Sequence, residues 1–214
     1  MSVLVLGDIH LGLPAAPGLD WAVGMLEAGA RAGAAGFICA GDIIDRARYT
    51  ADTYGEVTAF FERAVELFGP VHFIAGNHDT HHQLTLPRGV VVHESAPHSF
   101  RYHGMTIHTA AVAQDPDPRS VITAFPARGR VPGPHLGVLH TSLTGDYSRK
   151  PCLPATVEDL TQLGYDAWVL AHVHRPIELH QDPFIGWVGM GSALLVAAAG
   201  DGVEVTRLGA AAEQ

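Results

Sequence analysis

The sequence predicts a layered α/β sandwich that closes around a single domain spanning residues 1–214. In the first third of the chain, short apolar segments alternate with amphipathic helical segments, which is the pattern of parallel strands joined by crossover helices. Later in the chain, extended segments follow one another with few helices between them. An apolar content of 47% is enough for a core and excludes disorder as the main state.

The first third of the chain predicts three short strands, at residues 3–6, 37–40 and 71–75. Each is followed by, or ends beside, a glycine: Gly7, Gly41 and Gly76. Helices are expected between the strands, over residues 19–32 and 57–68. In the second helix, apolar residues recur at spacings of three and four, and Gly69 ends the pattern.

The rest of the chain predicts eight shorter strands, at residues 90–92, 99–102, 106–109, 136–140, 168–171, 177–179, 194–198 and 203–207. One more helix is expected to begin at Thr156, because an acid, Asp159, follows this capping residue by three positions. Glycine and proline cluster in residues 126–134, which predicts a surface loop. We find no internal repeat in the sequence.

Charge and composition narrow the class of protein. The longest apolar run has seven residues, at 193–199, far below the ~18 needed to span a bilayer. The N-terminus has no basic segment, so we expect no signal peptide, and two cysteines favour a reducing cytoplasm. A net charge of −9 disfavours wrapping nucleic acid by charge alone. The 14 histidines outnumber the 13 lysines and arginines, and that excess indicates a chemical role.

Polar side chains follow the ends of the predicted strands, where ligands bind in open α/β sheets. They are Asp8 and His10, Asp42 and Asp45, Asn77, His78 and Asp79, His140, and His172 and His174. The alternation of a strand predicts that Asp8 and His10 share one face, and that His172 and His174 share another. The glycines before the first three groups allow sharp turns at these points.

Seven of these residues form a mixed oxygen and nitrogen donor set without thiolate: Asp8, His10, Asp42, Asn77, His140, His172 and His174. Such donors suit borderline divalent metals such as manganese, iron, zinc or cobalt better than all-oxygen magnesium or calcium sites. Seven ligands are too many for one tetrahedral ion. They suit two ions ~3.5–4 Å apart that share a carboxylate and clamp a phosphoryl group.

In order along the chain, the motifs D-x-H, G-D-x-x-D, G-N-H-D, a lone His and H-x-H resemble those of the calcineurin-like metallophosphoesterase superfamily, over residues 3–180. The resemblance implies a four-layer α-β-β-α sandwich. It implies one metal held by Asp8, His10, Asp42 and His174, and a second held by Asp42, Asn77, His140 and His172. It also implies that a bridging water attacks phosphorus, and that His78 stabilises the transition state or protonates the leaving oxygen. Asp45 or Asp79 would orient the His78 ring.

Within the superfamily, three stretches resemble the nuclease subunit of SbcCD-type DNA repair complexes: residues 7–12, 139–143 and 163–168. This resemblance implies a manganese-dependent DNA exonuclease or endonuclease, with an ATPase of the SbcC type as its partner. Two features depart from the pattern. Ala171 replaces the glycine before H-x-H, and the 40 residues after His174 lead us to expect no capping domain.

Other interpretations remain open. A phosphatase or phosphodiesterase for nucleotides or other small phosphoesters is favoured by the acidic net charge, and a catalytically silent binding subunit is a third alternative. His81 and His82 are expected in a solvated loop rather than in contact with substrate. The basic side chains Arg46, Arg48, Arg149, Lys150 and Arg175 follow strand ends, where they either meet substrate phosphates or form an ordinary solvated rim.

Overall fold

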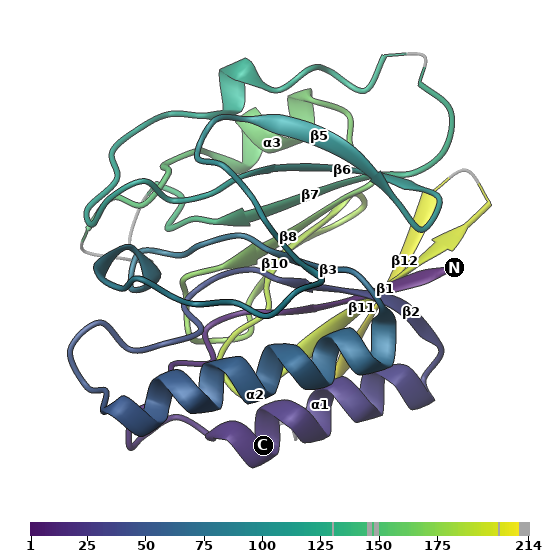
Figure 1. Ribbon diagram of the computed structural model, residues 1–214. Helices are drawn as coiled ribbons and strands as arrows, with labels where there is room; N and C mark the ends of the chain where they lie inside the picture. Colours follow the sequence, from purple (N-terminus) through teal and green to yellow (C-terminus); the bar gives the residue numbers. More distant parts are fainter. Residues whose placement is uncertain (130, 145–146, 148–149, 201, 210–214) are drawn as a thin grey trace, which may run out of the picture.

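The computed structural model describes residues 1–129, 131–144, 147, 150–200 and 202–209. Two six-stranded sheets stack face to face, with helices α1 and α2 under one sheet and α3 on the far side of the other (Figure 1). The predicted four-layer α-β-β-α sandwich is therefore confirmed. The outer layer over the second sheet is thin, because α3 has six residues and is accompanied by loops and short 3₁₀ turns.

The first sheet has the strand order β12-β11-β1-β2-β3-β4. Its strands are β1 (Ser2–Leu6), β2 (Ala34–Cys39), β3 (Val71–Phe73), β4 (Val90–Val92), β11 (Ala193–Ala199) and β12 (Gly202–Leu208). Strands β1 to β4 run parallel, and β11 and β12 pair antiparallel at the other edge. The parallel part brings the carboxyl ends of β1, β2 and β3 to one edge of the sandwich.

The second sheet has the order β5-β6-β7-β8-β10-β9. Its strands are β5 (His98–Tyr102), β6 (Met105–Ala110), β7 (His135–His140), β8 (Ala167–Ala171), β9 (Glu178–Gln181) and β10 (Phe184–Trp187). Strands β6, β7, β8 and β10 are parallel neighbours, and β5 and β9 close the edges antiparallel. This sheet is therefore mixed like the first, which the short strands of the sequence did not reveal.

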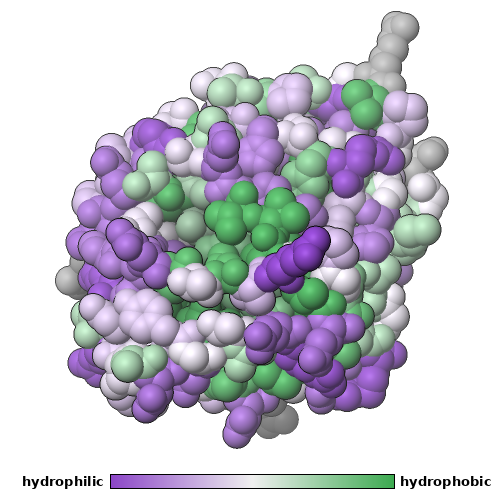
Figure 2. Space-filling model, viewed as in Figure 1, coloured by the Kyte–Doolittle hydropathy of each residue, from purple (hydrophilic) through white to green (hydrophobic). Residues whose placement is uncertain are grey.

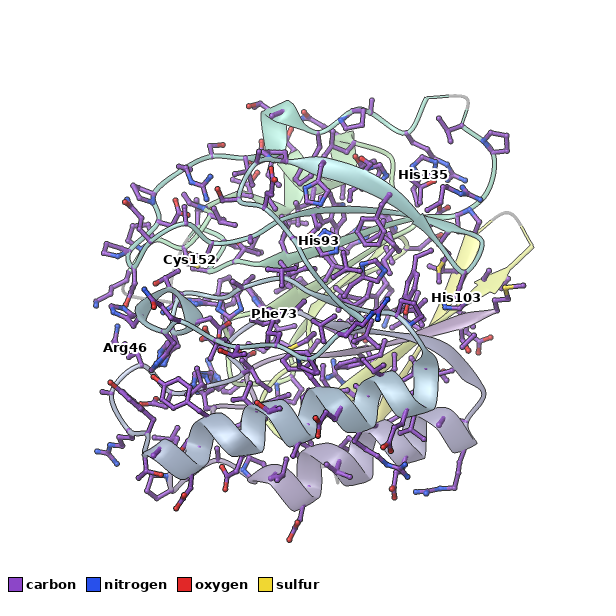
Figure 3. The ribbon with its side chains drawn as sticks, in the orientation of Figure 1. Arg46, Phe73, His93, His103, His135 and Cys152 are labelled. Atoms are coloured by element: carbon purple, nitrogen blue, oxygen red, sulfur yellow. The ribbon has the colours of Figure 1, made fainter. Side chains whose placement is uncertain are left out.

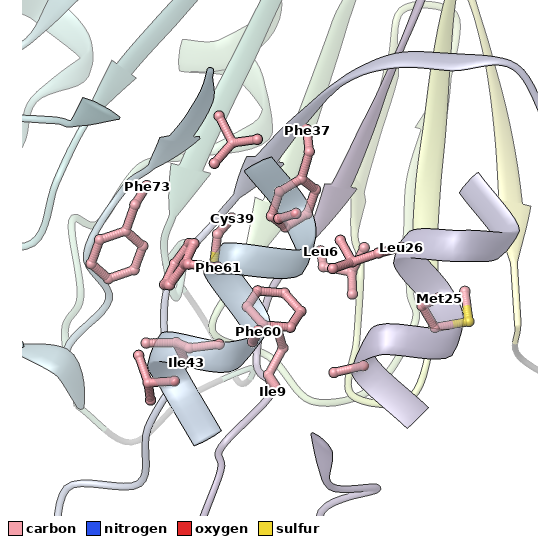
Figure 4. Packing of buried hydrophobic residues seen from close by; sticks show 14 of the residues in the cluster. Leu6, Ile9, Met25, Leu26, Phe37, Cys39, Ile43, Phe60, Phe61 and Phe73 are labelled. Atoms are coloured by element: carbon pink, nitrogen blue, oxygen red, sulfur yellow. The ribbon is translucent and has the colours of Figure 1, made fainter. Parts of the chain in front are cut away.

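Helices α1 (Leu19–Arg31) and α2 (Ala51–Phe68) pack their apolar faces on the first sheet. Aliphatic residues and five phenylalanines form this core, with Phe37 of the sheet edge-on to Phe60 of α2 at 5.8 Å between ring centroids (Figure 4). A second apolar cluster lies between the two sheets, and a third lies under α3 (Val157–Gln162). These three apolar clusters lie in successive layers and together hold the two sheets in place relative to each other.

Apart from strand β10, the helices and strands lie where the sequence predicts them, with shifted ends. Helix α2 begins at Ala51, six residues before the predicted start, because Thr50 and Thr53 form a capping box ahead of its periodic segment. The capping box predicted from Thr156 and Asp159 is confirmed at the start of α3. Strand β10 was not expected. Its short sequence, FIGW, offers no alternation of polar and apolar residues.

Several histidines away from the metal-site strand ends pack on sheet faces. His72, His93 and His98 form a row joined by nitrogen–nitrogen hydrogen bonds of 2.8 and 2.7 Å, stacked against Phe100. The row connects β3 and β4 of one sheet to β5 of the other. In Figure 3, His93 lies between the sheets, while His103 and His135 lie toward the end of the molecule opposite Arg46.

One face of the molecule shows an apolar area ringed by hydrophilic residues (Figure 2). At the edge of the first sheet, β4 exposes Val91 and Val92. Within the described part of the chain, no helix has both the length and the apolar character needed to cross a membrane.

Candidate metal centre

The candidate site lies where the strand ends of both sheets meet. Asp8 and His10 follow β1, Asp42 follows β2, and His172 follows β8. All four adopt positive φ, at 54°, 48°, 54° and 98° respectively, and they make up four of the seven non-glycine residues with this geometry in the described chain. Such backbone costs energy and gathers at functional sites. Strand alternation therefore does not align Asp8 with His10 or His172 with His174. The turns that follow the strands position these side chains.

In one half of the site, three side chains converge. The Nε2 atoms of His10 and His174 lie 3.0 Å apart. A carboxylate oxygen of Asp8 and one ring nitrogen each of His10 and His174 all lie within 4.8 Å of one another. Both oxygens of Asp8 accept the backbone N–H of His172, at 3.0 and 3.1 Å, which fixes the carboxylate in this half.

In the other half, two histidines meet an amide oxygen. Oδ1 of Asn77 lies 3.1 Å from Nε2 of His140 and 2.8 Å from Nδ1 of His172. Nδ1 of His140 lies 2.9 Å from the carbonyl oxygen of Ala40, and a carbonyl only accepts, so this nitrogen carries the proton. When the ring is neutral, the Nε2 lone pair of His140 therefore faces the acceptor oxygen of Asn77. An intervening cation satisfies both atoms.

Asp42 lies between the two halves. Its Oδ1 accepts the backbone N–H of His78 at 2.8 Å. Its Oδ2 lies 3.6 Å from Nε2 of His10 and 3.3 Å from Nε2 of His140, so one carboxylate oxygen faces a histidine from each half. The donor atoms therefore fit two cations that share this carboxylate, and the structure has a candidate two-metal site.

Two glycines allow the close approach of these turns. Gly41 has φ +94°, and a Cβ there would lie 2.5 Å from the backbone nitrogen of Gly76. A Cβ on Gly76 would lie 2.4 Å from Oδ1 of Asp42. Gly7 instead makes room for the Cβ of Ala171, which would lie 2.7 Å from a Cβ on residue 7. The alanine before His172 is therefore accommodated.

The electrostatics of the buried residues match a cation site. Burial, with the charge of Asp42, raises the pKa of Asp8 to about 7. Burial lowers the pKa of His140, but the charge of Asp42 and a hydrogen bond to it outweigh burial and raise this pKa to about 9. His140 in turn holds the pKa of Asp42 well below its usual range, against the opposite effect of burial. Burial lowers the pKa of His10 to about 4. In the absence of a cation, the proton of His140 supplies positive charge beside Asp42, and a bound divalent cation would supply that charge in its place.

The three residues expected to act in catalysis, His78, Asp45 and Asp79, differ in their contacts. Nδ1 of His78 accepts the backbone N–H of Arg46 at 3.2 Å and lies 3.3 Å from Oδ2 of Asp45. The Asp79 carboxylate accepts four backbone N–H groups instead, from Asp42, Ile43, Ile44 and Gly76. Of the two acids expected to orient the His78 ring, the structure brings Asp45 to it. Asp79 organises the backbone of the turn that carries Asp42.

Cys152 was not predicted to lie at the site, and the surroundings of His82 differ from the prediction. The Cys152 thiol is buried, donates to the carbonyl oxygen of His140 at 3.3 Å, and lies near the ring nitrogens of His140 and His172. No motif surrounds it. His82 is not solvated as expected, because its ring nitrogens contact the Tyr54 hydroxyl and the Asp45 carbonyl. Of the basic rim residues, Arg46 pairs with Asp115, and Arg149 lies outside the described residues.

Comparison with known proteins decides the family. The model of the calcineurin-like phosphoesterase family matches residues 1–187, most of the chain. The chain belongs to this family. A calcineurin-like phosphoesterase with this donor set is a metal-dependent hydrolase of phosphoesters, as the motifs predicted.

This calcineurin-like phosphoesterase is 30% identical over 161 residues to the uncharacterized metallophosphoesterase YhaO of Bacillus subtilis. The match covers 71% of this chain and 39% of YhaO, so the chain spans about two fifths of that curated relative. The resemblance to SbcCD nucleases stays a prediction, because the name of this relative specifies no substrate.

Solved structures share the fold. A dimetal phosphatase from Danio rerio matches with a TM-score of 0.64 and 10% identity, over 98% of this chain and 96% of that one. The purple acid phosphatase PPD1 of yellow lupin matches with a TM-score of 0.63 and 10% identity, over 100% of this chain and 52% of that one. At this identity the likeness concerns the sandwich alone.

Proposed function

We propose that this metal-dependent phosphoesterase cleaves phosphodiester bonds, acting on DNA as an exonuclease or endonuclease. The position of Asp42 supports the chemistry, because its Oδ2 faces histidines of both halves while its Oδ1 is bound to backbone. The sequence stretches shared with SbcCD-type nucleases support DNA as the substrate.

In this proposal, the first cation is held by Asp8, His10, Asp42 and His174, and the second by Asp42, Asn77, His140 and His172. Two divalent cations supply a Lewis acid and an activated water for attack on phosphorus. Nitrogen donors from four histidines favour borderline divalent metals over Mg²⁺ and Ca²⁺. The resemblance to SbcCD-type nucleases favours manganese among them, with iron, zinc, cobalt and nickel as the other candidates.

The His78 side chain acts on the substrate. Because Nδ1 accepts the N–H of Arg46, the proton of the neutral ring is on Nε2, which is then a hydrogen-bond donor to a phosphoryl oxygen. The Asp45 carboxylate lies 3.3 Å from Nδ1 and holds the ring in place. The tautomer inferred from the contact with Arg46 favours transition-state stabilisation over protonation of the leaving oxygen.

A small phosphoester, such as a nucleotide, is the second candidate substrate. The net charge of −9 favours it, because a polyanionic DNA strand is repelled by an acidic surface. A partner ATPase of the SbcC type and a cytoplasmic location go with the DNA proposal and stay predictions.

One panel of assays separates the candidates. Purified protein with Mn²⁺ is given bis(p-nitrophenyl) phosphate, p-nitrophenyl phosphate, and linear single- and double-stranded DNA. Degradation of DNA supports the nuclease. Turnover of the small diester without DNA degradation rejects the nuclease and supports the small-molecule enzyme. No turnover of any substrate by protein shown to bind metal would support the silent binding subunit instead.

A further inference from the structure

The edge strand β4 of the first sheet is short, apolar and exposed. It consists of three valines, and among the described strands it pairs with β3 alone. Val91 and Val92 are 43% and 56% exposed. Because an open sheet edge pairs readily with another chain, native proteins commonly protect such an edge with charged side chains, proline or a covering loop. A bare edge of valines is therefore a candidate interaction surface.

The backbone of β4 presents hydrogen-bonding groups to this edge. Two hydrogen bonds of 2.9 Å flank the strand: the carbonyl of Gly89 accepts from β3, and the N–H of His93 donates to β3. In a parallel ladder, alternate residues bond to the same neighbour, so Val91 between them bonds to β3 as well. The N–H and carbonyl groups of Val90 and Val92 therefore point out of the sheet.

A hollow lined mainly by apolar residues lies beside this edge. Its volume is about 200 Å³, and its walls include Phe73, Leu84, Leu86 and Val92. In Figure 3, Phe73 and His93, which lie beside and directly after β4, are near the middle of the view. Figure 2 shows an apolar area near the middle of the same face. Covering this surface favours association in proportion to the apolar area buried.

The edge strand of the other sheet on this side, β5, is protected differently. It exposes Ser99 and Arg101 in place of valines. The Arg101 guanidinium is held over the edge by bonds to the Thr106 hydroxyl and the Gly104 carbonyl, at 2.9 and 3.0 Å. A charged side chain on an edge strand opposes pairing with another chain. The contrast singles out β4.

Opposite charges flank the three valines. Arg88 lies two residues before β4 and Glu94 two residues after it, so both are three residues from Val91. Both side chains are exposed, and no ion pair joins either of them to another described residue. A copy of this segment that runs in the opposite direction brings arginine to glutamate at each end, whereas a copy that runs in the same direction brings like charges together. The segment is therefore complementary to itself, as a two-fold interface requires.

We propose that β4 is the contact surface of a dimer of this chain, in which two β4 strands pair antiparallel about a two-fold axis at Val91. Val90 then lies opposite Val92 of the partner subunit, and their outward backbone groups hydrogen-bond across the interface. Arg88 lies at the same end as Glu94 of the partner subunit. The pairing is independent of the metal centre and of the proposed function.

The register follows from the direction of the backbone groups. A slip of one residue would place an outward residue opposite Val91, whose groups bond to β3. The N–H of Val90 already reaches the carbonyl of Pro87 at 3.3 Å. The bonds that hold the dimer therefore run chiefly from the N–H of Val92 to the carbonyl of Val90 of the partner subunit. A contact this short predicts a weak dimer, with a dissociation constant roughly in the micromolar range.

Analytical ultracentrifugation over a range of protein concentrations measures this dimer. The wild-type protein should pass from monomer to dimer as the concentration rises. Val92→Lys places a charge at the centre of the contact and should leave the folded protein, checked by circular dichroism, monomeric throughout. Val131→Lys is the matched control, because Val131 is 52% exposed in the loop before β7 and its substitution should leave the dimer intact.

A charge exchange tests the register. Arg88→Glu and Glu94→Arg each place like charges together at both ends of the contact, and each should raise the dissociation constant about five- to thirtyfold. The double variant Arg88→Glu/Glu94→Arg restores opposite charges and should return the constant to within about threefold of the wild-type value. This recovery is specific to antiparallel pairing about Val91.

Amide hydrogen exchange followed by NMR supplies a second readout. Exchange of the Val92 N–H should slow as the dimer forms, whereas that of the Val91 N–H, already bonded to β3, should not change. A wild-type protein that stays monomeric at every concentration would overturn the proposal. So would a dimer that Val92→Lys leaves intact, or a charge exchange without recovery in the double variant.

Discussion

At the scale of single residues, the candidate metal centre depends on backbone turns that lie too close to neighbouring atoms to accept an added side chain. Gly76 is the clearest case, because its missing side chain makes room for the carboxylate of Asp42. Gly76→Ala should therefore displace Asp42 and lower kcat about a hundredfold, the cost of a misplacement near 1 Å. Steady-state kinetics on bis(p-nitrophenyl) phosphate measure this effect.

Gly55→Ala is the control for that substitution. Gly55 lies in helix α2 with nothing within 4 Å of its missing Cβ, so alanine there should stabilise the protein by about 0.5–1 kcal/mol and leave kcat unchanged. Equal kinetics for Gly76→Ala and the wild type would show that the turn adjusts and that the packing argument is wrong.

Asp79 makes a second prediction at this scale. Its buried carboxylate accepts four backbone N–H groups, and an amide offers only one oxygen for them. Asp79→Asn should therefore cost roughly 2–4 kcal/mol in the free energy of unfolding, measured with denaturant. The exposed Asp52→Asn should change it by less than about 0.5 kcal/mol. Unchanged stability with lost activity would instead return Asp79 to the role of orienting His78.

At the scale of elements, the histidine row of His72, His93 and His98 links the two sheets at the β4–β5 edge. The carbonyl of Ala96 accepts from Nδ1 of His98, and with one proton on each ring, His98 then accepts from His93 and His93 from His72. Burial lowers the pKa of His72 to about 4, and burial with the charges of its neighbours lowers that of His93 to about 3.

The row predicts a loss of stability in acid. The unfolded chain takes up protons at His72 and His93 near pH 6.5, whereas the folded chain resists protonation of His72 until about pH 4 and of His93 until about pH 3. The contribution is therefore complete above pH 6.5 and is lost as the pH falls toward these values, by on the order of 2–3 kcal/mol for each of the two histidines. Denaturant unfolding at several pH values measures it. The double variant His72→Phe/His93→Phe should flatten the acid limb, and identical limbs in both proteins would contradict this account.

The elements also show how much of the candidate site could be predicted from the sequence. The polar motifs at the strand ends predicted most of the residues that the structure brings together there, because short apolar runs and glycines mark strand ends plainly. The start of α2 at Ala51 was missed, since capping by Thr50 precedes the apolar period. The contacts of Asp79, His82 and Cys152 were not predictable. They depend on which backbone groups the folded turns bring together, and no local pattern encodes that.

At the scale of the whole molecule, the metal centre joins the two sheets. Asp8, Asp42 and Asn77 come from the first sheet, and His140 and His172 come from the second. Cations bound between them should stabilise the folded state by mass action, by about 2.7 kcal/mol at a hundredfold excess over Kd. For a domain of this size, that raises Tm by about 5–10 °C.

Thermal unfolding with increasing Mn²⁺ tests that stabilisation. Tm should rise with the logarithm of the free Mn²⁺ concentration, and chelation with EDTA should reverse the rise. Ca²⁺, which prefers all-oxygen sites, should give a smaller shift. A Tm that is independent of Mn²⁺ would mean that the donors at the sheet junction do not hold a cation in the folded protein.

The central claim is that one carboxylate, Asp42, is shared by two cations. Equilibrium dialysis followed by elemental analysis measures the number of Mn²⁺ ions bound per chain. The account predicts two for the wild-type protein, fewer than one for Asp42→Asn, and two for the exposed control Asp182→Asn, with all three proteins shown to be folded. A single ion in the wild-type protein, or two retained by Asp42→Asn, would contradict it.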